Sequence, residues 1–384
     1  MDGDLAACHR DTKRLGSIRV LYLSTDLQRG GLPLRLVQLV RRLATMGVTP
    51  IVGCLAARGP LNDVLEAEGI ETFHCDARGG WDPTCLLRFA RVVRRVNPDL
   101  IHASLFHANL AARLCGRIDR SRPVITSTVT IEVERRWHRR IEGLSCGLSS
   151  AHVANSDAVA SHLVDELGFP PGLTRVIPNG IDIDAIDAAP PISRASFGIR
   201  NDTPLVVWAG RMDPVKNVDT LIEAVVRVNQ RRGVQLALVG DGPDRRRIQT
   251  LVDNCAASPC VSFVGWSDNV AGWLKSADAL VFPSRTEGCP NVVLEAMAAR
   301  CPVIASRIPP HAQLLADGAA GRLCAWNDPA EFAGAILEEL AADGRTDRRE
   351  FARERLLRNH ALAGAAERWL DCYREFLGGR SGAF

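Results

Sequence analysis

Short apolar runs alternate with amphipathic segments along most of the chain. Ile18–Ser24 is continuous and β-branched, a pattern typical of a buried strand, and Leu32–Met46 then carries apolar residues at helical spacing. Further strand-like runs in the first half occupy residues 50–55, 70–75, 99–104, 123–129, 151–156 and 174–179. The segments between them have helical character: Leu61–Glu68, Cys85–Val96, His107–Ile118, Glu134–Leu148 and Ala158–Leu167. This alternation predicts a parallel sheet that is covered on both faces.

A break separates this half from the next. Ile177–Thr203 is rich in Pro, Gly, Asp and Asn, lacks sustained periodicity, and is interpreted as an interdomain linker. The alternation then restarts, with strand-like runs at 204–210, 235–240, 260–265, 278–284 and 302–306. Helices are expected at Asn217–Arg231, Asp244–Cys255, Val270–Lys275 and Asn291–Arg300, followed by a long helical region from Arg345 to Phe376.

The length agrees with this division, because 384 residues exceed one ordinary core and suit two domains of roughly 150–200 residues each. We therefore predict an α/β protein with two tandem doubly wound, Rossmann-like domains that face each other across a cleft. The predicted domains span residues 1–177 and 178–359. Ligands of such folds bind outside the carboxyl ends of the strands, which directs attention to the loops there.

Composition narrows the class of protein. Hydrophobic and charged contents of 46% and 24% are those of a globular protein, and no apolar stretch approaches the roughly 20 residues that span a bilayer. The first residues, MDGDLAACHRDTKRLGS, lack a signal-peptide pattern, so a cytoplasmic location is expected. The 12 cysteines are scattered without a Cys-x-x-Cys pair and are expected to be reduced. A net charge of only +3 gives no support for nucleic-acid binding.

Two cations follow the first predicted strand of the second domain. Gly210 allows the backbone to turn, and Arg211 and Lys216 lie in the loop before the next helix. Fixed positive charges near a helix N-terminus suit a diphosphate, although a solvated strand–helix connection is the ordinary alternative. Gly240 and Gly242, in VGDGP, form a second turn suited to close approach at the end of the next strand.

Two acids flank the start of a later helix. Glu287 follows a strand and is expected at the sheet edge, and Pro290 suits the first helical position. The N–H groups of Asn291 and Val292 then have no partner within the helix and could bind a phosphate or a sugar hydroxyl. Glu295, one turn inside the helix, could bind the vicinal hydroxyls of a ribose, and Glu287 could bind a sugar beyond the phosphates. The alternative is a dipole-stabilised helix acid and an exposed loop acid.

Together these segments resemble the family-4 retaining glycosyltransferases of the GT-B fold. The matching motifs are GR at Gly210-Arg211, KN at Lys216-Asn217, VGDGP, PSRTEG, the Glu-x7-Glu pair, and PNGID at Pro178–Asp182. The resemblance implies that Arg211 and Lys216 bind the donor's diphosphate, that Glu295 binds the ribose and that Glu287 binds the transferred sugar. It also implies front-face transfer, in which the leaving diphosphate helps to deprotonate the acceptor, so that no dedicated nucleophile is needed.

The resemblance further implies the substrates. The donor would be a UDP- or GDP-linked nucleotide-diphosphate sugar, the acceptor a glycan or lipid-linked molecule of cell-surface polysaccharide synthesis, and no cofactor is expected. The first domain would carry the acceptor side, and a C-terminal helix at about 360–384 would cross back onto it. Trp266 and Cys289 are expected to contact the donor and to help select its base and sugar.

The first domain matches the family less closely. Gly30-Gly31 resembles a Gly-Gly loop that approaches the donor phosphate and the acceptor, but GGLPLR lacks the acid common after the glycines. The family histidine would stand at Ser104, which leaves His102 and His107. His107 begins a predicted helix at a strand's carboxyl end, and we predict that it contacts the donor sugar or the acceptor. A polar helix-start residue is the alternative.

Two further features admit more than one interpretation. Asp182-Ile-Asp184 has the spacing of a metal-binding pair but lies in the predicted linker, so no metal site is predicted. The basic segment Glu134–Gly143 is either a solvated helix face or a peripheral contact with the inner membrane or a lipid-linked acceptor.

Three other functions are alternatives to sugar transfer. A nucleotide-sugar 2-epimerase has the same two-domain fold and would need no acceptor. A nucleotide-sugar-binding scaffold without catalysis would be expected to lack at least one of the four charged residues of the motifs. It is disfavoured because all four are present: Arg211, Lys216, Glu287 and Glu295. A nicotinamide dehydrogenase is disfavoured by the lack of Gly-x-Gly-x-x-Gly after the first strand.

Overall fold

Seven parallel strands form the first sheet, in the order β3-β2-β1-β4-β5-β6-β7. The structure is a computed structural model that describes residues 17–79, 82–118, 121–131, 136–255, 257–341 and 345–378. The strands are β1 (Ile18–Ser24), β2 (Val48–Cys54), β3 (Glu71–His74), β4 (Leu100–Ser104), β5 (Val124–Thr128), β6 (Ala151–Ala154) and β7 (Thr174–Val176). The helices around them are α1 (Gly31–Ala44), α2 (Pro60–Ala67), α3 (Pro83–Val96), α4 (Phe106–Ile118), α5 (Arg136–Ser145) and α6 (Asp157–Ser161).

Six parallel strands form the second sheet, in the order β10-β9-β8-β11-β12-β13. They are β8 (Leu205–Ala209), β9 (Gln235–Val239), β10 (Val261–Gly265), β11 (Ala279–Phe282), β12 (Val303–Ser306) and β13 (Arg322–Cys324). Their helices are α7 (Ile183–Ala188), α8 (Val218–Asn229), α9 (Arg245–Asn254), α10 (Val270–Ser276), α11 (Asn291–Ala298), α12 (Pro309–Leu314) and α13 (Pro329–Ala341). The predicted α/β class with two parallel sheets is confirmed.

Both sheets have a point at which the strand order changes direction. It lies between β1 and β4 in the first sheet and between β8 and β11 in the second. Crevices form at such points because the helices on either side cross to opposite faces of the sheet. The loops after these four strands carry most of the predicted site residues, and the loops after β9 and β10 carry Gly240, Gly242 and Trp266.

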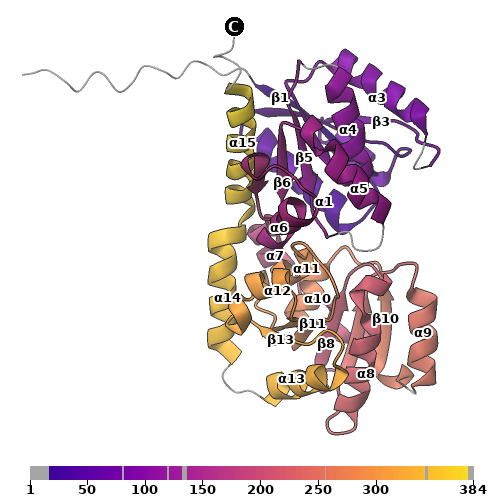
Figure 1. The fold of residues 1–384 in the computed structure, drawn as a ribbon. Helices are drawn as coiled ribbons and strands as arrows, with labels where there is room; N and C mark the ends of the chain where they lie inside the picture. The colour runs from indigo at the N-terminus through magenta and orange to yellow at the C-terminus, as the bar shows by residue number, and fades with distance from the viewer. Residues whose placement is uncertain are drawn as a thin grey trace, which may run out of the picture.

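Two long helices join the domains along one side of the molecule (Figure 1). α14 (Arg345–His360) packs on α11 of the second domain, and α15 (Leu362–Gly378) packs on α1 of the first. The sequence suggested one long helical region, but the helix is interrupted at Ala361. There Ile181 forms an isolated parallel bridge with Ala361, and its N–H donates to the His360 carbonyl at 2.8 Å. The pairing joins residues far apart in the sequence, so the spacing of apolar residues could not have predicted it.

The predicted linker is shorter than expected. Within Ile177–Thr203 the chain forms α7, which packs on α11, and a 3₁₀ turn at Arg194–Phe197. Arg194 also donates to the Ser276 carbonyl through Nε at 3.2 Å, so the segment is attached to the second domain. Its polar residues make these local contacts while Ile186 and Ile199 are buried, which explains why no amphipathic period was visible.

The sequence also led to expectations about the cysteines and about membrane-spanning segments. Every cysteine of the described residues is free. No helix in the described part of the chain is long and apolar enough to cross a membrane.

Candidate functional site

Glycines hold the loops after β8 and β9 against each other. Gly240 has φ +127°, and a Cβ there would lie 1.9 Å from the Gly210 carbonyl oxygen. A Cβ on Gly242 would lie 2.4 Å from the Met212 carbonyl oxygen. The Met212 N–H donates to the Asp241 carbonyl at 2.9 Å, so the two loops form one unit at the sheet edge.

The loop after β8 also joins the loop after β11. The Lys216 ammonium lies 2.6 Å from a Glu287 carboxylate oxygen, and both side chains are mostly shielded from solvent. Asn217, the next residue, holds this loop to the end of β11, because its Nδ2 donates to the Pro283 carbonyl at 3.1 Å. The structure therefore brings together one predicted cation and one predicted acid.

Arg211 lies in the same loop but is directed to solvent. Its side chain is 72% exposed, and its Nε lies 3.0 Å from an Asp213 carboxylate oxygen. An exposed ion pair of this kind contributes little stability, so the guanidinium can exchange partners at low cost.

The first turns of α1 and α11 face each other across the domain boundary. Asn291 Nδ2 donates to the Gly31 carbonyl at 3.3 Å, and a Cβ on Gly31 would meet the same nitrogen at 3.6 Å. One turn further along each helix, Arg35 forms an ion pair with Glu295. Burial raises the pKa of the Glu295 carboxyl, and the Arg35 cation offsets part of that rise. Two helix N-termini thus converge beside Gly30, which precedes α1.

The turn into α11 is fixed by buried polar contacts. Asn179 Nδ2 donates to the Cys289 carbonyl and to Asn291 Oδ1, each at 2.9 Å. The Cys289 side chain is buried, which raises the pKa of its thiol to about 12. Gly288 allows the domains to touch, since a Cβ there would lie 2.2 Å from the Val129 carbonyl oxygen.

Two predicted donor contacts lie further from this centre. Val292, the second residue of α11, is partly buried against the core of the second domain. Trp266 is exposed after β10, and its Nε1 donates to Asp268 at 3.0 Å. Asp268 in turn lies 3.7 Å from Arg29 of the first domain, so this rim residue is close to the Gly30 loop.

The histidines of the first domain have different surroundings. His102 is buried, with Nδ1 2.8 Å from the Tyr373 hydroxyl and its ring stacked at 4.2 Å on Trp369. It therefore fastens α15 to the first sheet. His107 is half-buried near the start of α4, with its ring centroid 5.5 Å from that of His138. Ser104 is buried and shares a 2.6 Å hydrogen bond with Ser127.

Several site residues were missed from the sequence. The sequence pattern does not single out Arg35, because nothing local indicates its partner 260 residues away. Asn179 lies within the recognised PNGID motif, and its amide role could have been suspected there. His311 is buried near Glu287; burial lowers its pKa to about 4, while the Glu287 charge opposes the shift.

Metal-binding side chains do not cluster in the described residues: no group of three or more His, Cys, Asp or Glu is placed to hold an ion. Asp182 caps α7 instead, because its carboxylate accepts from the Ala185 N–H at 3.0 Å. Metal independence of any reaction stays a prediction.

Two family models match the chain. Residues 29–185 match Glycosyltransferase Family 4, and residues 203–342 match Glycosyl transferases group 1. The chain is 28% identical over 359 residues to D-inositol 3-phosphate glycosyltransferase 2 of Catenulispora acidiphila, covering 82% of this chain and 83% of that protein. It is 34% identical over 191 residues to the lipopolysaccharide core biosynthesis glycosyltransferase LpsE of Rhizobium meliloti, half of this chain and 54% of that protein.

Solved structures agree on the fold. A glycosyltransferase from Rickettsia africae superposes with a TM-score of 0.81 at 19% identity, covering 94% of this chain and 99% of that one. Anabaena HepE in complex with UDP-glucose also gives 0.81, at 21% identity, covering 93% and 100%. These similarities confirm the predicted two-domain GT-B architecture.

Proposed function

Because the chain belongs to the group 1, family 4 glycosyltransferases, we propose that it transfers a sugar from a nucleotide-diphosphate sugar to an acceptor with retention at the anomeric carbon. The observation that carries this proposal is the meeting of the α1 and α11 N-terminal turns beside the Lys216–Glu287 pair. Helix N-termini and a lysine together suit a diphosphate. The carboxylates on either side suit sugar hydroxyls.

Arg211 completes the diphosphate site in this proposal. Its exposed guanidinium would leave Asp213 and bind the β-phosphate, where a bidentate contact is available. Gly210, Gly240 and Gly242 keep the backbone beneath free of side-chain atoms, so the phosphates can approach closely.

The two acids divide the remaining donor contacts. Glu287 would hold the transferred sugar, with Lys216 screening its charge from the phosphates. Glu295 would bind the ribose, for which it must exchange Arg35 for two hydroxyl donors. Trp266, exposed at the rim, would contact the base, which we expect to be uracil or guanine.

Charge stabilisation on the leaving diphosphate is the main catalytic effect expected here, and it requires neither a nucleophile nor a cofactor. The departing phosphate oxygen would take the acceptor proton while the new glycosidic bond forms on the same face. His107, at the β1/β4 crevice, is the proposed contact for the donor sugar or the acceptor.

The acceptor is proposed to be a glycan or lipid-linked glycan of cell-surface polysaccharide synthesis. Relatives named for lipopolysaccharide core biosynthesis support this class. On the acceptor side, α5 exposes Leu144, 88% accessible, and Trp137, which suits contact with a lipid-linked molecule or the membrane surface. The named relatives are transferases, so the epimerase alternative gains no support.

Thermal-shift and turnover assays with a panel of UDP- and GDP-sugars test the proposal. One nucleotide sugar should stabilise the protein, by about 2.7 kcal/mol at 100 times its dissociation constant. Arg211→Ala should reduce turnover of that donor at least tenfold, through loss of a charge-assisted contact of about 1.5–3 kcal/mol. Arg246→Ala, at an exposed arginine of α9, is the matched control. Equal turnover in both variants would refute the role of Arg211.

A further inference from the structure

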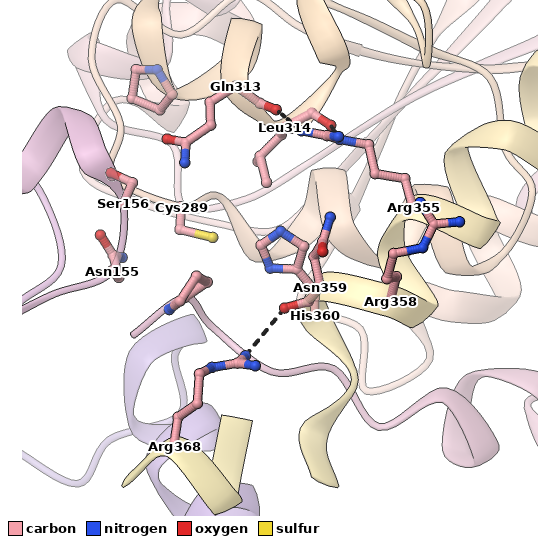
Figure 2. A pocket seen from close by; sticks show the side chains of 13 residues that line it. Asn155, Ser156, Cys289, Gln313, Leu314, Arg355, Arg358, Asn359, His360 and Arg368 are labelled. Atoms are coloured by element: carbon pink, nitrogen blue, oxygen red, sulfur yellow. Dashed lines mark hydrogen bonds between the residues drawn. The ribbon is translucent and has the colours of Figure 1, made fainter. Parts of the chain in front are cut away.

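A cavity lies at the junction of the domains, on the α14–α15 side (Figure 2). Its volume is about 290 Å³, and it is bounded by α12, by the α14–α15 junction and by the loop after β6. Gly288 and Cys289 form part of its wall, so the cavity lies next to the Glu287 loop. Asn155 and Ser156 line one side in Figure 2, and Arg358, Asn359 and His360 line the other.

Positive charge dominates this cavity. Arg355, Arg358 and Arg368 line it, whereas none of its lining residues is Asp or Glu. Arg355 donates to the Gln313 carbonyl at 2.7 Å and Arg368 to the Asn359 carbonyl at 3.1 Å. Within the described residues, none of these three guanidinium groups has a carboxylate partner.

Two more deeply buried arginines have acid partners, which these three lack. Arg113 pairs with Glu142 and Arg353 with Asp187, both at 2.6 Å. Cations gathered away from acids repel one another and lose hydration, a cost that an anion would remove. Burial lowers the pKa of His360, and the Arg368 and Arg355 charges lower it further, which reflects the same positive field.

Two residues that line the cavity also carry a polar atom without a partner. Within the described residues, Nε of Arg368 and Oδ1 of Asn155 have no hydrogen-bond partner, and both atoms are shielded from solvent. Guanidinium N–H groups donate to anionic oxygens. The three arginines therefore make the cavity suited to an anion.

We propose that this cavity binds a small phosphate-bearing anion. Arg358 and Arg368 hold the phosphate. The volume is at the lower end for ligand pockets and suits a small phosphomonoester better than a nucleotide sugar. A ligand here links the first domain to α14 and α15, and so favours the arrangement in which Gly288 touches Val129.

Calorimetry on the full chain with inorganic phosphate, glycerol 3-phosphate and uncharged glycerol tests the proposal. Both phosphates should bind and glycerol should not; tighter binding of glycerol 3-phosphate would identify an organic phosphate as the natural class, and equal binding the free ion. Arg358→Gln should weaken phosphate binding at least tenfold. Arg358 is exposed at the rim, so this variant should keep its fold, and Arg246→Gln serves as the control.

Phosphate could also occupy the proposed donor site, and two variants separate the sites. Arg211→Ala should leave binding at this cavity intact, and Arg358→Gln should leave the affinity for UDP or GDP unchanged. Absence of phosphate binding would overturn the proposal, as would binding that is lost in Arg211→Ala and kept in Arg358→Gln. Neither result depends on which sugar the protein transfers, so the proposed function is tested separately.

Discussion

Single glycines decide how closely the loops after β8 and β9 can approach. At Gly240 the backbone has φ +127° and leaves no room for a Cβ beside the Gly210 carbonyl. Both features exclude a side chain, and the close approach places Arg211 and Lys216 at one sheet edge. This requirement belongs to the backbone, and the sequence indicated it only as a Gly-x-Gly pattern.

Gly240→Ala should lower the free energy of unfolding by about 2 kcal/mol or more, because it combines backbone strain with overpacking. Gly233→Ala is the matched control, since a Cβ there meets nothing within 4 Å. Urea titration of both variants checks the prediction. Equal stabilities would mean that the two loops separate without cost.

Charge pairs are the second feature at this scale. Arg35 and Glu295 are 15% and 20% exposed, and they connect the domains. In the absence of ligand this pair satisfies the carboxylate that we assign to the ribose. A bound nucleotide must therefore displace Arg35.

A double-mutant cycle with Arg35→Gln and Glu295→Gln should give a coupling of about 1–2 kcal/mol in the free energy of unfolding. The cycle on Arg200 and Asp202, both largely exposed, should give less than about 1 kcal/mol. Saturating UDP or GDP should reduce the first coupling and leave the second unchanged. A first coupling that persists with bound nucleotide would argue against the ribose role of Glu295.

Helices α14 and α15 show how an element can belong to both domains. α15 contributes Trp369 and Tyr373 to the core of the first domain, whereas α14 packs on α11 of the second. Helical periodicity predicted both segments. The interruption at Ala361 coincides with its pairing with Ile181, and residues so far apart in sequence reveal no such contact.

Trp369→Ala should destabilise the protein by about 3–5 kcal/mol, the usual cost of truncating a buried aromatic side chain. The ring is 8% exposed and stacks on His102. Leu357→Ala on α14, at 44% exposure, should change stability by less than about 0.5 kcal/mol. Thermal unfolding of both variants provides the measurement. Similar melting temperatures would show that α15 docks loosely.

Helices and strands could be predicted where the spacing of their own apolar residues determines the secondary structure. The long apolar strands, such as β1 and β8, and the amphipathic helices appear where their periodicity places them. β13 has only three residues, and α12 begins with two prolines, so neither presents a readable period. For the site, loop position and residue type indicated Lys216 and Glu287, but Arg35 and the cationic cavity depend on how the domains meet.

At the scale of the whole molecule, buried neutral histidines make stability depend on pH. Burial lowers the pKa of His102 and His152 to about 3 and that of His311 to about 4. Below the ordinary value of 6.5 the unfolded chain binds protons that the folded protein excludes. Folding stability should therefore fall as the pH is lowered from about 6.5 toward these values.

Each such group contributes a slope of up to about 1.4 kcal/mol per pH unit in that window. His102→Gln should make the loss of stability between pH 6 and 5 shallower by about that amount. Leu357→Ala, at an exposed position and without change to a titratable group, should leave the slope unchanged. Urea titrations across this range measure the slopes. Parallel curves for His102→Gln and the parent protein would show that His102 accepts its proton without unfolding.

The docking of α15 also sets an order of events during synthesis. Tyr373, which contacts His102, emerges from the ribosome 271 residues after it. Domains generally fold in the order in which they are made. Here the first domain leaves the ribosome early, yet its apolar face over β1 and β4 stays uncovered until translation has passed the second domain. The part of the molecule that is made first is thus the part that finishes folding last.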